Sequence, residues 1–119
     1  MRLLLVDDNR LNLELFVDVL EAAGHEVATE TDALAGQRRA LAEQFDLIVL
    51  DIQMPKIDGY EVCRALRAAG MRGPIFALSS NALPDDIAEG RKAGFDAYLT
   101  KPITPAALRE AVARARPAA

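Results

Sequence analysis

The chain has 119 residues, of which 51% are hydrophobic and 27% are charged, and its net charge is -4. This length and apolar content suit one domain with a single core, whereas the mild acidity argues against nucleic acid as a direct ligand. No apolar stretch approaches the roughly 20 residues of a membrane span, and the first residues do not form a signal peptide. The single cysteine, Cys63, fits a reducing compartment, so we expect a cytoplasmic protein.

Five short apolar runs alternate with five longer amphipathic segments along the chain. The runs, interpreted as strands, cover residues 3–6, 27–29, 47–50, 75–78 and 97–99. The amphipathic segments, interpreted as helices, cover residues 10–23, 33–43, 58–69, 84–93 and 104–115. This alternation predicts an α/β fold in which helices cover both faces of a parallel sheet.

The strength of each apolar run predicts its place in that sheet. The runs at 3–6, 47–50 and 75–78 are continuously apolar, as strands buried on both faces are. The runs at 27–29 and 97–99 are weaker and follow charged residues, which is typical of edge strands. With right-handed crossovers, these features predict a doubly wound (βα)5 three-layer sandwich with the strand order 2-1-3-4-5.

The first predicted helix should bury one stripe of side chains and expose another. Asn9 is the expected cap of its first turn. The expected core stripe consists of Leu15, Phe16, Val19, Leu20 and Ala23. Leu13 and Val17 lie off that stripe and share a face at i,i+4 spacing. We predict that this pair forms an exposed apolar patch suited to docking a helix bundle, although scattered apolar surface residues are also normal.

Polar residues follow four of the predicted strands. Asp7 and Asp8 follow the first strand, Asp51 the third, Ser79 the fourth and Lys101 the fifth. In an open parallel sheet, ligands bind outside the carboxyl ends of the strands, near the point where the strand order reverses. The first and third strands flank that point, so we expect the three aspartates to converge.

Three converging carboxylates repel one another, and a divalent cation relieves that repulsion. A partly open site suits Mg²⁺, which retains waters and readily takes a phosphate oxygen. We expect Asp8 and Asp51 to bind the ion directly, Asp7 to act through water, and the backbone carbonyl of Gln53 to complete the set. The alternative is that Asp7 and Asp8 merely cap the first helix, but Asn9 is the better candidate for that role.

Asp51 is the expected reactive residue because a carboxylate held beside a metal ion can attack phosphorus. The ammonium of Lys101 would stabilise charge on the phosphoryl oxygens, and Ser79 would donate a hydrogen bond to one of them. Each signal has an ordinary alternative: Lys101 as a solvated surface lysine, Ser79 as a turn cap, and Ser80 as an equally available hydroxyl. Their coincidence at four strand ends favours a phosphoryl-acceptor site.

The chain resembles the receiver domain of bacterial response regulators over about residues 2–115. The resemblance rests on four segments: LLLVDDN, LIVLDIQMPKIDGYEV, FALSSNA and DAYLTKPI. It implies a flavodoxin-like fold, Mg²⁺ as cofactor, and transfer to Asp51 from a phosphohistidine on a sensor histidine kinase or histidine phosphotransfer protein. It also implies an output protein of unknown identity and a monomer or phosphorylation-dependent dimer, with no membrane contact. The stretch DDNRLNLELF is similar both to single-domain cell-cycle regulators and to receivers of hybrid kinases.

The same resemblance implies a switching mechanism. Ser79 would be the switch hydroxyl, Lys101 the phosphate-binding lysine and Tyr98 a switch aromatic that rotates. Phosphorylation would then reshape the face formed by residues 84–93, 97–99 and 104–115. The alternative for Tyr98 is an ordinary half-buried aromatic on an edge strand. The bond that joins Lys101 to Pro102 is usually cis in the family.

Two amide side chains complete the implied site. Gln53 and Asn81 lie two residues beyond Asp51 and Ser79, at positions that tune the lifetime of the phosphoryl group in the family. Either amide could orient a hydrolytic water.

Three other functions compete with this interpretation. A phosphohydrolase of the haloacid dehalogenase type also uses an Asp nucleophile and Mg²⁺, but usually has a second Asp where Gln53 stands, and a cap domain. A flavin carrier would need a hydroxyl-rich loop where Asp7 and Asp8 lie, and a never-phosphorylated scaffold would not need the acidic site. We therefore expect a single receiver domain of residues 1–119, with no output domain in this chain. It should be no enzyme, but an acceptor that assists its own phosphorylation and slow dephosphorylation.

Overall fold

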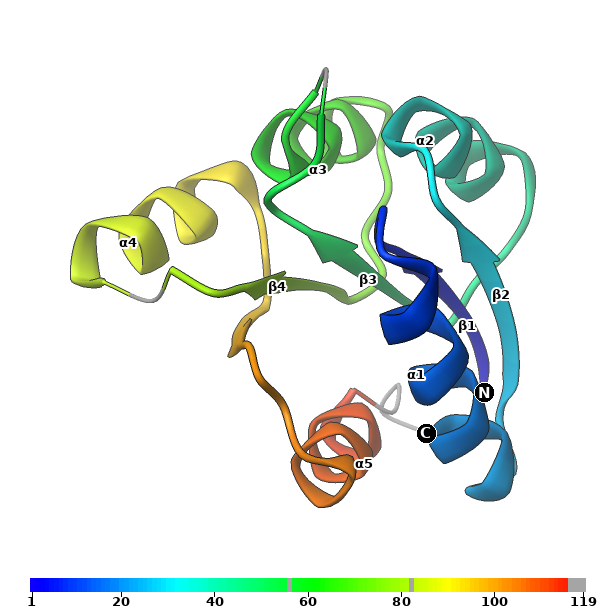
Figure 1. Ribbon diagram of the computed structural model, residues 1–119. Coiled ribbons are helices and arrows are strands. Elements are labelled where there is room, and N and C mark those ends of the chain that lie inside the picture. The colour runs from blue at the N-terminus through cyan, green and yellow to red at the C-terminus, as the bar shows by residue number, and fades with distance from the viewer. Residues whose placement is uncertain (56, 82, 116–119) are drawn as a thin grey trace.

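The computed structural model describes residues 1–55, 57–81 and 83–115, and within these ranges five strands alternate with five helices (Figure 1). The strands are β1 (Arg2–Val6), β2 (Glu26–Glu30), β3 (Leu47–Asp51), β4 (Ile75–Ser79) and β5 (Ala97–Thr100). The helices are α1 (Arg10–Ala22), α2 (Ala33–Ala42), α3 (Gly59–Ala68), α4 (Pro84–Ala93) and α5 (Pro105–Arg114). Each predicted element is therefore present, and each observed end lies within one residue of the predicted end.

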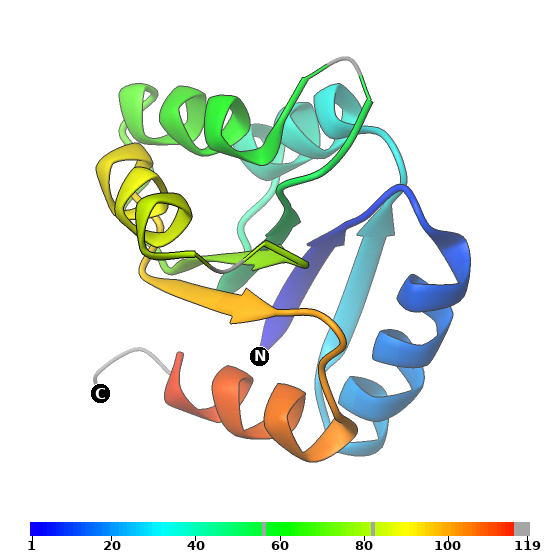
Figure 2. The same cartoon turned by 60° about the vertical axis from the view of Figure 1, so that its left-hand side comes forward.

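The five strands form one parallel sheet in the order β2-β1-β3-β4-β5. Helices α2, α3 and α4 lie on one side of the sheet, and α1 and α5 lie on the other (Figures 1 and 2). The predicted three-layer sandwich, its strand order and its two edge strands are confirmed. In the part of the chain that the structure describes, no helix is long and apolar enough to cross a membrane.

The inner strands bury side chains on both faces of the sheet. Alternate residues point to opposite faces, so each strand feeds two cores. On the α2–α3 side, the buried strand residues are Leu4, Val6, Ile48, Leu50, Ile75 and Ala77. On the α1–α5 side, they are Leu3, Leu5, Leu47, Val49, Phe76 and Leu78. The continuous apolar runs in the sequence reflect this double burial.

At their carboxyl ends, β3, β4 and β5 each extend one residue beyond the predicted apolar run, and each added residue is polar. Asp51, Ser79 and Thr100 are the last residues of β3, β4 and β5. Asp51 pairs in register with Leu78, and Ser79 pairs with Thr100. Backbone pairing does not depend on side-chain polarity, so the ladder continues through these positions. The sheet thus fixes the backbone of two site residues directly.

The buried face of α1 differs from the predicted one. Leu13, Phe16 and Leu20 face the core, whereas Leu15 is 51% exposed and Ala23 is exposed. The prediction that Leu13 is exposed is therefore wrong, since only 4% of its surface is accessible. The observed stripe follows i,i+3,i+7 spacing, which the sequence pattern allows equally well.

The start of α1 agrees with the prediction. The side chain of Asn9 accepts hydrogen bonds from the backbone N–H groups of Leu11 and Asn12, as a helix cap does. The cap leaves Asp7 and Asp8, which precede it, available for another role. The alternative that these two aspartates only cap the helix is thus disfavoured by the geometry.

Gly59 brings the start of α3 against the backbone of the site strand. A Cβ there would lie 2.7 Å from the Asp51 carbonyl oxygen and 2.9 Å from the Ile52 Cα. We expect Gly59→Ala to lower the free energy of unfolding by about 1–3 kcal/mol, because backbone must shift to admit the methyl group. Urea denaturation measures this. At Gly73 a Cβ meets no heavy atom within 4 Å, so equal losses in Gly59→Ala and Gly73→Ala would contradict the packing described.

Candidate functional site

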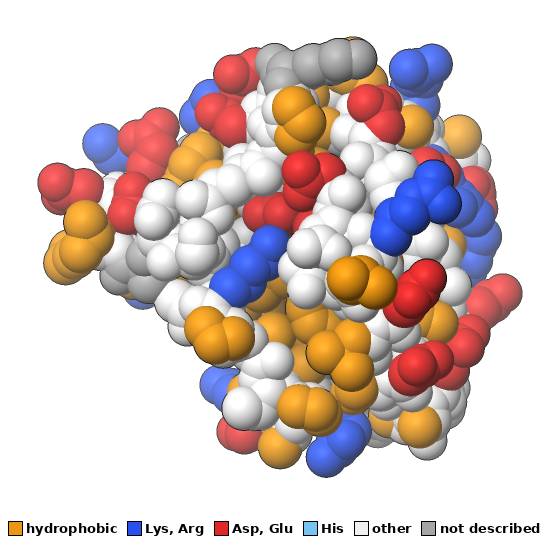
Figure 3. Space-filling model, viewed as in Figure 1, with side chains coloured by type: hydrophobic (Ala, Val, Ile, Leu, Met, Phe, Trp, Pro, Cys, Tyr) orange, Lys and Arg blue, Asp and Glu red, His pale blue; other side chains and the backbone are white. Residues whose placement is uncertain are grey.

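Three carboxylates converge at the carboxyl ends of β1 and β3, as predicted. Asp7 and Asp8 directly follow β1, Asp51 ends β3, and one carboxylate oxygen of each lies within 4.8 Å of the others. Acidic side chains gather near the centre of the face shown in Figure 3, with a basic side chain beside them. The backbone N–H of Asp7 donates to the Glu30 carbonyl at 3.1 Å, which extends the sheet to this point.

Asp7 and Asp51 are held in the same way. Each is only 2% exposed. The Oδ1 atom of Asp7 accepts the backbone N–H of Asn9 at 2.9 Å, and that of Asp51 accepts the N–H of Gln53 at 3.0 Å. The Oδ2 atoms face Lys101 Nζ, at 2.9 Å from Asp51 and 3.3 Å from Asp7. One oxygen of each carboxylate is thus fixed by backbone, and the other faces the site.

Burial sets the electrostatics of the site. It raises the pKa of Asp51 from 3.8 to about 6, although the Lys101 ammonium and the Gln53 N–H oppose this and the charge of Asp7 adds to it. Burial alone would lower the pKa of Lys101, but its hydrogen bond to Asp51 and the charges of both aspartates raise it above its usual value. Lys101 is therefore firmly cationic, whereas Asp51 ionises at a cost that another cation would remove.

The carboxylate cluster fits a divalent cation. Among the described residues, Asp7 Oδ2 is buried and has no hydrogen-bond partner, and its charge faces the Lys101 ammonium at 3.3 Å. Three carboxylates face one ammonium, and Asp8 is exposed, so the cluster has excess negative charge and is open to solvent. The division of ligand roles among Asp7, Asp8, Asp51 and the Gln53 carbonyl stays a prediction.

Lys101 reaches the carboxylates because β4 and β5 are paired at their ends. The backbone N–H of Lys101 donates to the Ser79 carbonyl at 2.8 Å. The peptide bond between Lys101 and Pro102 is cis, as the resemblance implied. Ser79 is fully buried, and its hydroxyl oxygen accepts the N–H of Asn81 at 3.0 Å.

The neighbouring hydroxyl has a different partner. Ser80 is exposed and donates to the side-chain oxygen of Gln53, from its hydroxyl at 2.7 Å and from its N–H at 3.3 Å. The structure thus separates the two serines: Ser79 belongs to the buried strand end, and Ser80 orients Gln53. The predicted influence of Gln53 and Asn81 on phosphoryl lifetime stays a prediction.

Tyr98 lies on β5 and is half-buried. Its hydroxyl donates to the backbone carbonyl of Asn81 at 2.8 Å and lies 3.1 Å from the hydroxyl of Tyr60 in α3. Sequence reasoning missed Tyr60 as a partner of Tyr98. The available signal was weak: the chain contains only these two tyrosines, and no spacing rule links positions on α3 and β5.

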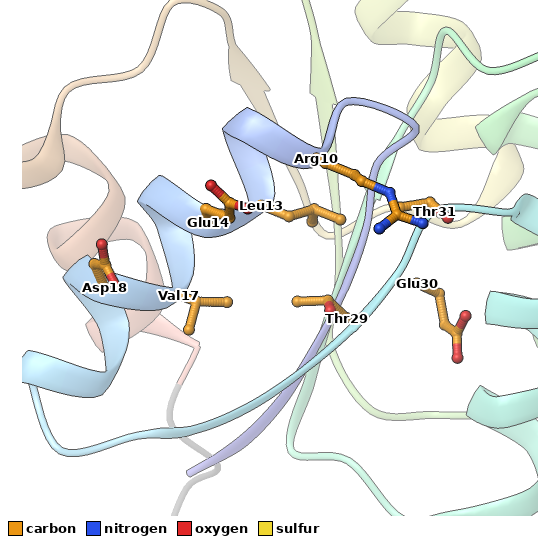
Figure 4. A pocket seen from close by; sticks show the side chains of 8 residues that line it. All are labelled: Arg10, Leu13, Glu14, Val17, Asp18, Thr29, Glu30 and Thr31. Carbon is orange, nitrogen blue, oxygen red and sulfur yellow. The ribbon is translucent and has the colours of Figure 1, made fainter.

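The predicted patch of Leu13 and Val17 is a pocket rather than an exposed apolar surface. Val17 is half-buried, and the two side chains line a cavity of about 410 Å³ between α1 and the end of β2 (Figure 4). The other lining residues are Arg10, Glu14, Asp18, Thr29, Glu30 and Thr31. None of the clustered aspartates lines this pocket. The exposed leucines of α1 are instead Leu11, at 75%, and Leu15, at 51%.

Comparison with known proteins identifies the family. The family model of the response regulator receiver domain matches residues 3–113. The alkaline phosphatase synthesis transcriptional regulatory protein PhoP of Bacillus subtilis is 38% identical over 115 residues, which cover 97% of this chain and 47% of PhoP. The chain thus spans about half the length of the transcriptional regulators it matches, and a smaller share, 12%, of the sensor histidine kinase RcsC of Salmonella typhi.

Solved structures agree with the sequence comparison. The chemotaxis protein CheY4 of Vibrio cholerae is 30% identical with a TM-score of 0.91, covering 96% of this chain and 97% of CheY4. The receiver domain of the sensor histidine kinase PA1611 from Pseudomonas aeruginosa, solved with magnesium coordinated in its active site cleft, is 35% identical with a TM-score of 0.87, covering 96% and 95%. The family match, the doubly wound sheet and the acidic cluster at its switch point agree. This chain belongs to the response regulator receiver domain family and is a receiver domain of two-component signalling systems.

Proposed function

We propose that this receiver acts in the cytoplasm and accepts a phosphoryl group on Asp51 from the phosphohistidine of a sensor histidine kinase or a histidine phosphotransfer protein. The observation that carries the proposal is the Asp51 carboxylate itself. It is 2% exposed, lies in the aspartate cluster and contacts the Lys101 ammonium at 2.9 Å. A carboxylate in this setting can act as a nucleophile toward phosphorus.

The transfer exchanges one bond to phosphorus for another. An oxygen of Asp51 forms the new P–O bond while the P–N bond to the donor imidazole breaks, and that bond's electron pair stays on the imidazole nitrogen. Lys101 lies where its ammonium can neutralise charge on the phosphoryl oxygens. Ser79 would then donate its hydroxyl proton to one of these oxygens. Formation of the acyl phosphate on Asp51 is reversible, so the chain acts as a signal acceptor rather than a turnover enzyme.

Mg²⁺ is the cofactor that we propose for this site. Bound by Asp8 and Asp51, with Asp7 through water, it would supply a Lewis acid that offsets the excess carboxylate charge. Two observations support this proposal: three carboxylates converge within 4.8 Å, and the buried Oδ2 atom of Asp7 has no hydrogen-bond partner among the described residues. The magnesium that is coordinated in the PA1611 receiver domain is consistent with this proposal.

Incubation with a small phosphodonor such as acetyl phosphate tests the proposed function. With Mg²⁺ present, intact-mass spectrometry should show addition of one phosphoryl group. Chelation with EDTA should suppress that addition, because the carboxylate cluster is then uncompensated. If no adduct forms with Mg²⁺, or if EDTA leaves it unchanged, the proposed chemistry is wrong.

We propose that phosphorylation controls the surface formed by α4, β5 and α5, where an output protein of unknown identity would bind. The support is a short chain of hydrogen bonds. Asn81 bonds to the Ser79 hydroxyl through its N–H and to the Tyr98 hydroxyl through its carbonyl. If the phosphoryl group draws Ser79 toward Asp51, the backbone that holds Tyr98 must respond. The phosphoryl group thus biases two positions of Tyr98.

Two exposed leucines of α1 are the proposed docking site for the phosphodonor protein. Leu11 and Leu15 share a face at i,i+4 spacing, and α1 begins two residues after Asp8. Hydrophobic side chains lie over α1 and α5, beside the acidic group (Figure 3). This pair replaces Leu13 and Val17, which the fold places in a pocket.

Replacing Leu11 and Leu15 together by glutamine should slow phosphotransfer from a phosphorylated histidine phosphotransfer domain by about 30-fold, if each leucine contributes about 1 kcal/mol to docking. Labelling by acetyl phosphate should not change, because the site is intact. The matched control replaces Leu34 and Leu41 of α2, which are 43% and 49% exposed. Equal slowing by both pairs, or by neither, would refute docking on α1.

A further inference from the structure

Two tyrosines from different layers of the fold meet beside α4. The hydroxyl of Tyr60, in α3, lies 3.1 Å from the hydroxyl of Tyr98, in β5. The Tyr60 hydroxyl also lies 3.1 Å from the backbone carbonyl of Asp86, in the first turn of α4. The Tyr98 hydroxyl lies 2.8 Å from the backbone carbonyl of Asn81, which follows β4. These contacts tie α3, α4, β5 and the end of β4 together.

The number of protons limits this group of contacts. Two tyrosine hydroxyls have one proton each, whereas the group contains three hydrogen-bond contacts. Both backbone carbonyls can only accept. The shortest contact, from Tyr98 to Asn81, takes the Tyr98 proton. The single proton of Tyr60 therefore has two acceptors at equal distance: the Tyr98 hydroxyl oxygen and the Asp86 carbonyl.

We propose that Tyr60 is a positioning residue for Tyr98, which donates to the Tyr98 hydroxyl while that ring is docked and to the Asp86 carbonyl when the ring leaves. "Docked" denotes the observed position, in which Tyr98 donates to Asn81. A donor to the Tyr98 oxygen strengthens the bond that this hydroxyl makes in turn. The second acceptor keeps the Tyr60 proton satisfied after rotation, so Tyr60 stabilises the docked ring without locking it.

Packing holds the Tyr60 ring in place independently of its hydroxyl. The ring meets Phe95 edge-on, with centroids 6.2 Å apart and planes at 74°. Burial, with the nearby Tyr98 hydroxyl, raises the pKa of Tyr60 above its usual value, so the hydroxyl keeps its proton at neutral pH. Tyr60→Phe therefore removes one donor and leaves the ring contact intact.

The docked ring of Tyr98 also rests against the backbone of α4. A Cβ added at Gly90 would lie 3.0 Å from Tyr98 Cδ2. A side chain at position 90 would therefore crowd the docked Tyr98 ring. The closeness of the Tyr98 ring to Gly90 gives a local signature of the docked position.

Because Asp51 phosphorylation is itself proposed, the signalling consequence of Tyr60 rests on that function. The docked Tyr98 hydroxyl bonds to the Asn81 carbonyl, and the Asn81 N–H bonds to the Ser79 hydroxyl. We therefore assign the docked position to the state that the phosphoryl group favours, and expect it to be partly populated in the resting protein. Loss of the Tyr60 donor should then weaken the apparent affinity for Mg²⁺ with beryllofluoride, a phosphoryl mimic, by about two- to fivefold. The expected change is modest because wild-type Tyr60 donates to the Asp86 carbonyl when the ring is not docked. Its proton therefore favours the docked position only by the difference between two hydrogen bonds.

The experiment compares the wild type with Tyr60→Phe, Tyr98→Phe and the double variant. Beryllofluoride titration in Mg²⁺ should show the two- to fivefold weakening for Tyr60→Phe alone. In the Tyr98→Phe background, Tyr60→Phe should cause no further change, because the hydroxyl that it positions is gone. An undiminished effect in that background, or none in either, would overturn the proposal.

A second measurement does not depend on phosphoryl chemistry. The chain contains two tyrosines, so Tyr60→Phe leaves Tyr98 as the only source of tyrosine ring signals. In the resting protein, the NMR cross-peak between the Tyr98 ring and the Gly90 Hα should weaken in Tyr60→Phe. An unchanged cross-peak would refute the positioning role. If the wild type does not respond to beryllofluoride, the proposed function fails, and this cross-peak still decides whether Tyr60 positions Tyr98.

Discussion

Asp51→Asn is expected to abolish phosphoryl incorporation from both small phosphodonors and phosphohistidine proteins. Asparagine has nearly the same shape and can still accept the Gln53 N–H, but its amide is not a nucleophile that forms an acyl phosphate. Asp7 and Asp8 lie close to Asp51, but both follow β1, so neither places a carboxylate at the end of β3. Intact-mass spectrometry after incubation with acetyl phosphate and Mg²⁺ measures the effect.

The matched control is Asp18→Asn. Asp18 is an exposed residue of α1 and lies outside the carboxylate cluster. This variant should be labelled like the wild type, because it makes the same chemical change away from the site. Labelling of Asp51→Asn at the wild-type level would show that another residue is the acceptor.

Without divalent cations, stability is expected to fall as the pH rises from about 4 to about 7. The pKa of Asp51 is 3.8 in the unfolded chain and about 6 in the folded protein. Between these values the unfolded chain has released the proton and the folded protein retains it, so rising pH favours unfolding. The stability that Asp51 contributes is present below pH 3.8 and is lost as the pH rises through about 6. One pKa unit corresponds to about 1.4 kcal/mol, so the loss is on the order of 3 kcal/mol.

Urea denaturation in EDTA across this pH range measures the loss, with Asp51→Asn as the reference. That variant should lack the Asp51 contribution, and at pH 7 it should be more stable than the metal-free wild type. Groups that do not contact Asp51 cancel in the difference, including Glu43, whose pKa is lowered by hydrogen bonds from Arg2 and Arg39. Mg²⁺ should restore the wild type at pH 7 and affect the variant less. Parallel pH curves for the two proteins would contradict the electrostatics described.

The sheet and its helices could be predicted because double burial leaves a strong pattern. Continuous apolar runs identify strands that are covered on both faces, and these runs set the strand order with few alternatives. The ends of the strands could be predicted less well, because the polarity of a side chain shows where burial stops and not where backbone pairing stops. Asp51 and Ser79 therefore belong to their strands, although both residues are polar.

The orientation of α1 could not be predicted, because two stripes fit its sequence. Phe16 and Leu20 belong to both the predicted and the observed stripe, so the choice depends on Leu13 or Leu15. Only the position of the helix on the sheet decides between them, and that position follows from packing against α5 residues such as Leu108. Local periodicity contains no such information.

The acidic site was predictable because the topology brings strand ends together, whereas its connections to the surface were not. Asp7, Asp8 and Asp51 converge because the carboxyl ends of β1 and β3 meet at the point where the strand order reverses. The contact of Tyr60 with Tyr98 joins side chains 38 positions apart, on α3 and β5. It depends on ring packing at a layer boundary, which leaves no periodic signal in the sequence.

Locating the phosphoryl group tests the central claim most directly. After incubation with acetyl phosphate and Mg²⁺, borohydride reduces an aspartyl phosphate to homoserine, and peptide mass spectrometry then identifies the modified position. We predict a single modification at Asp51, absent when EDTA is present. Modification at another residue instead of Asp51, or none in a protein that is folded and loaded with Mg²⁺, would contradict the proposal that Asp51 is the phosphoryl acceptor.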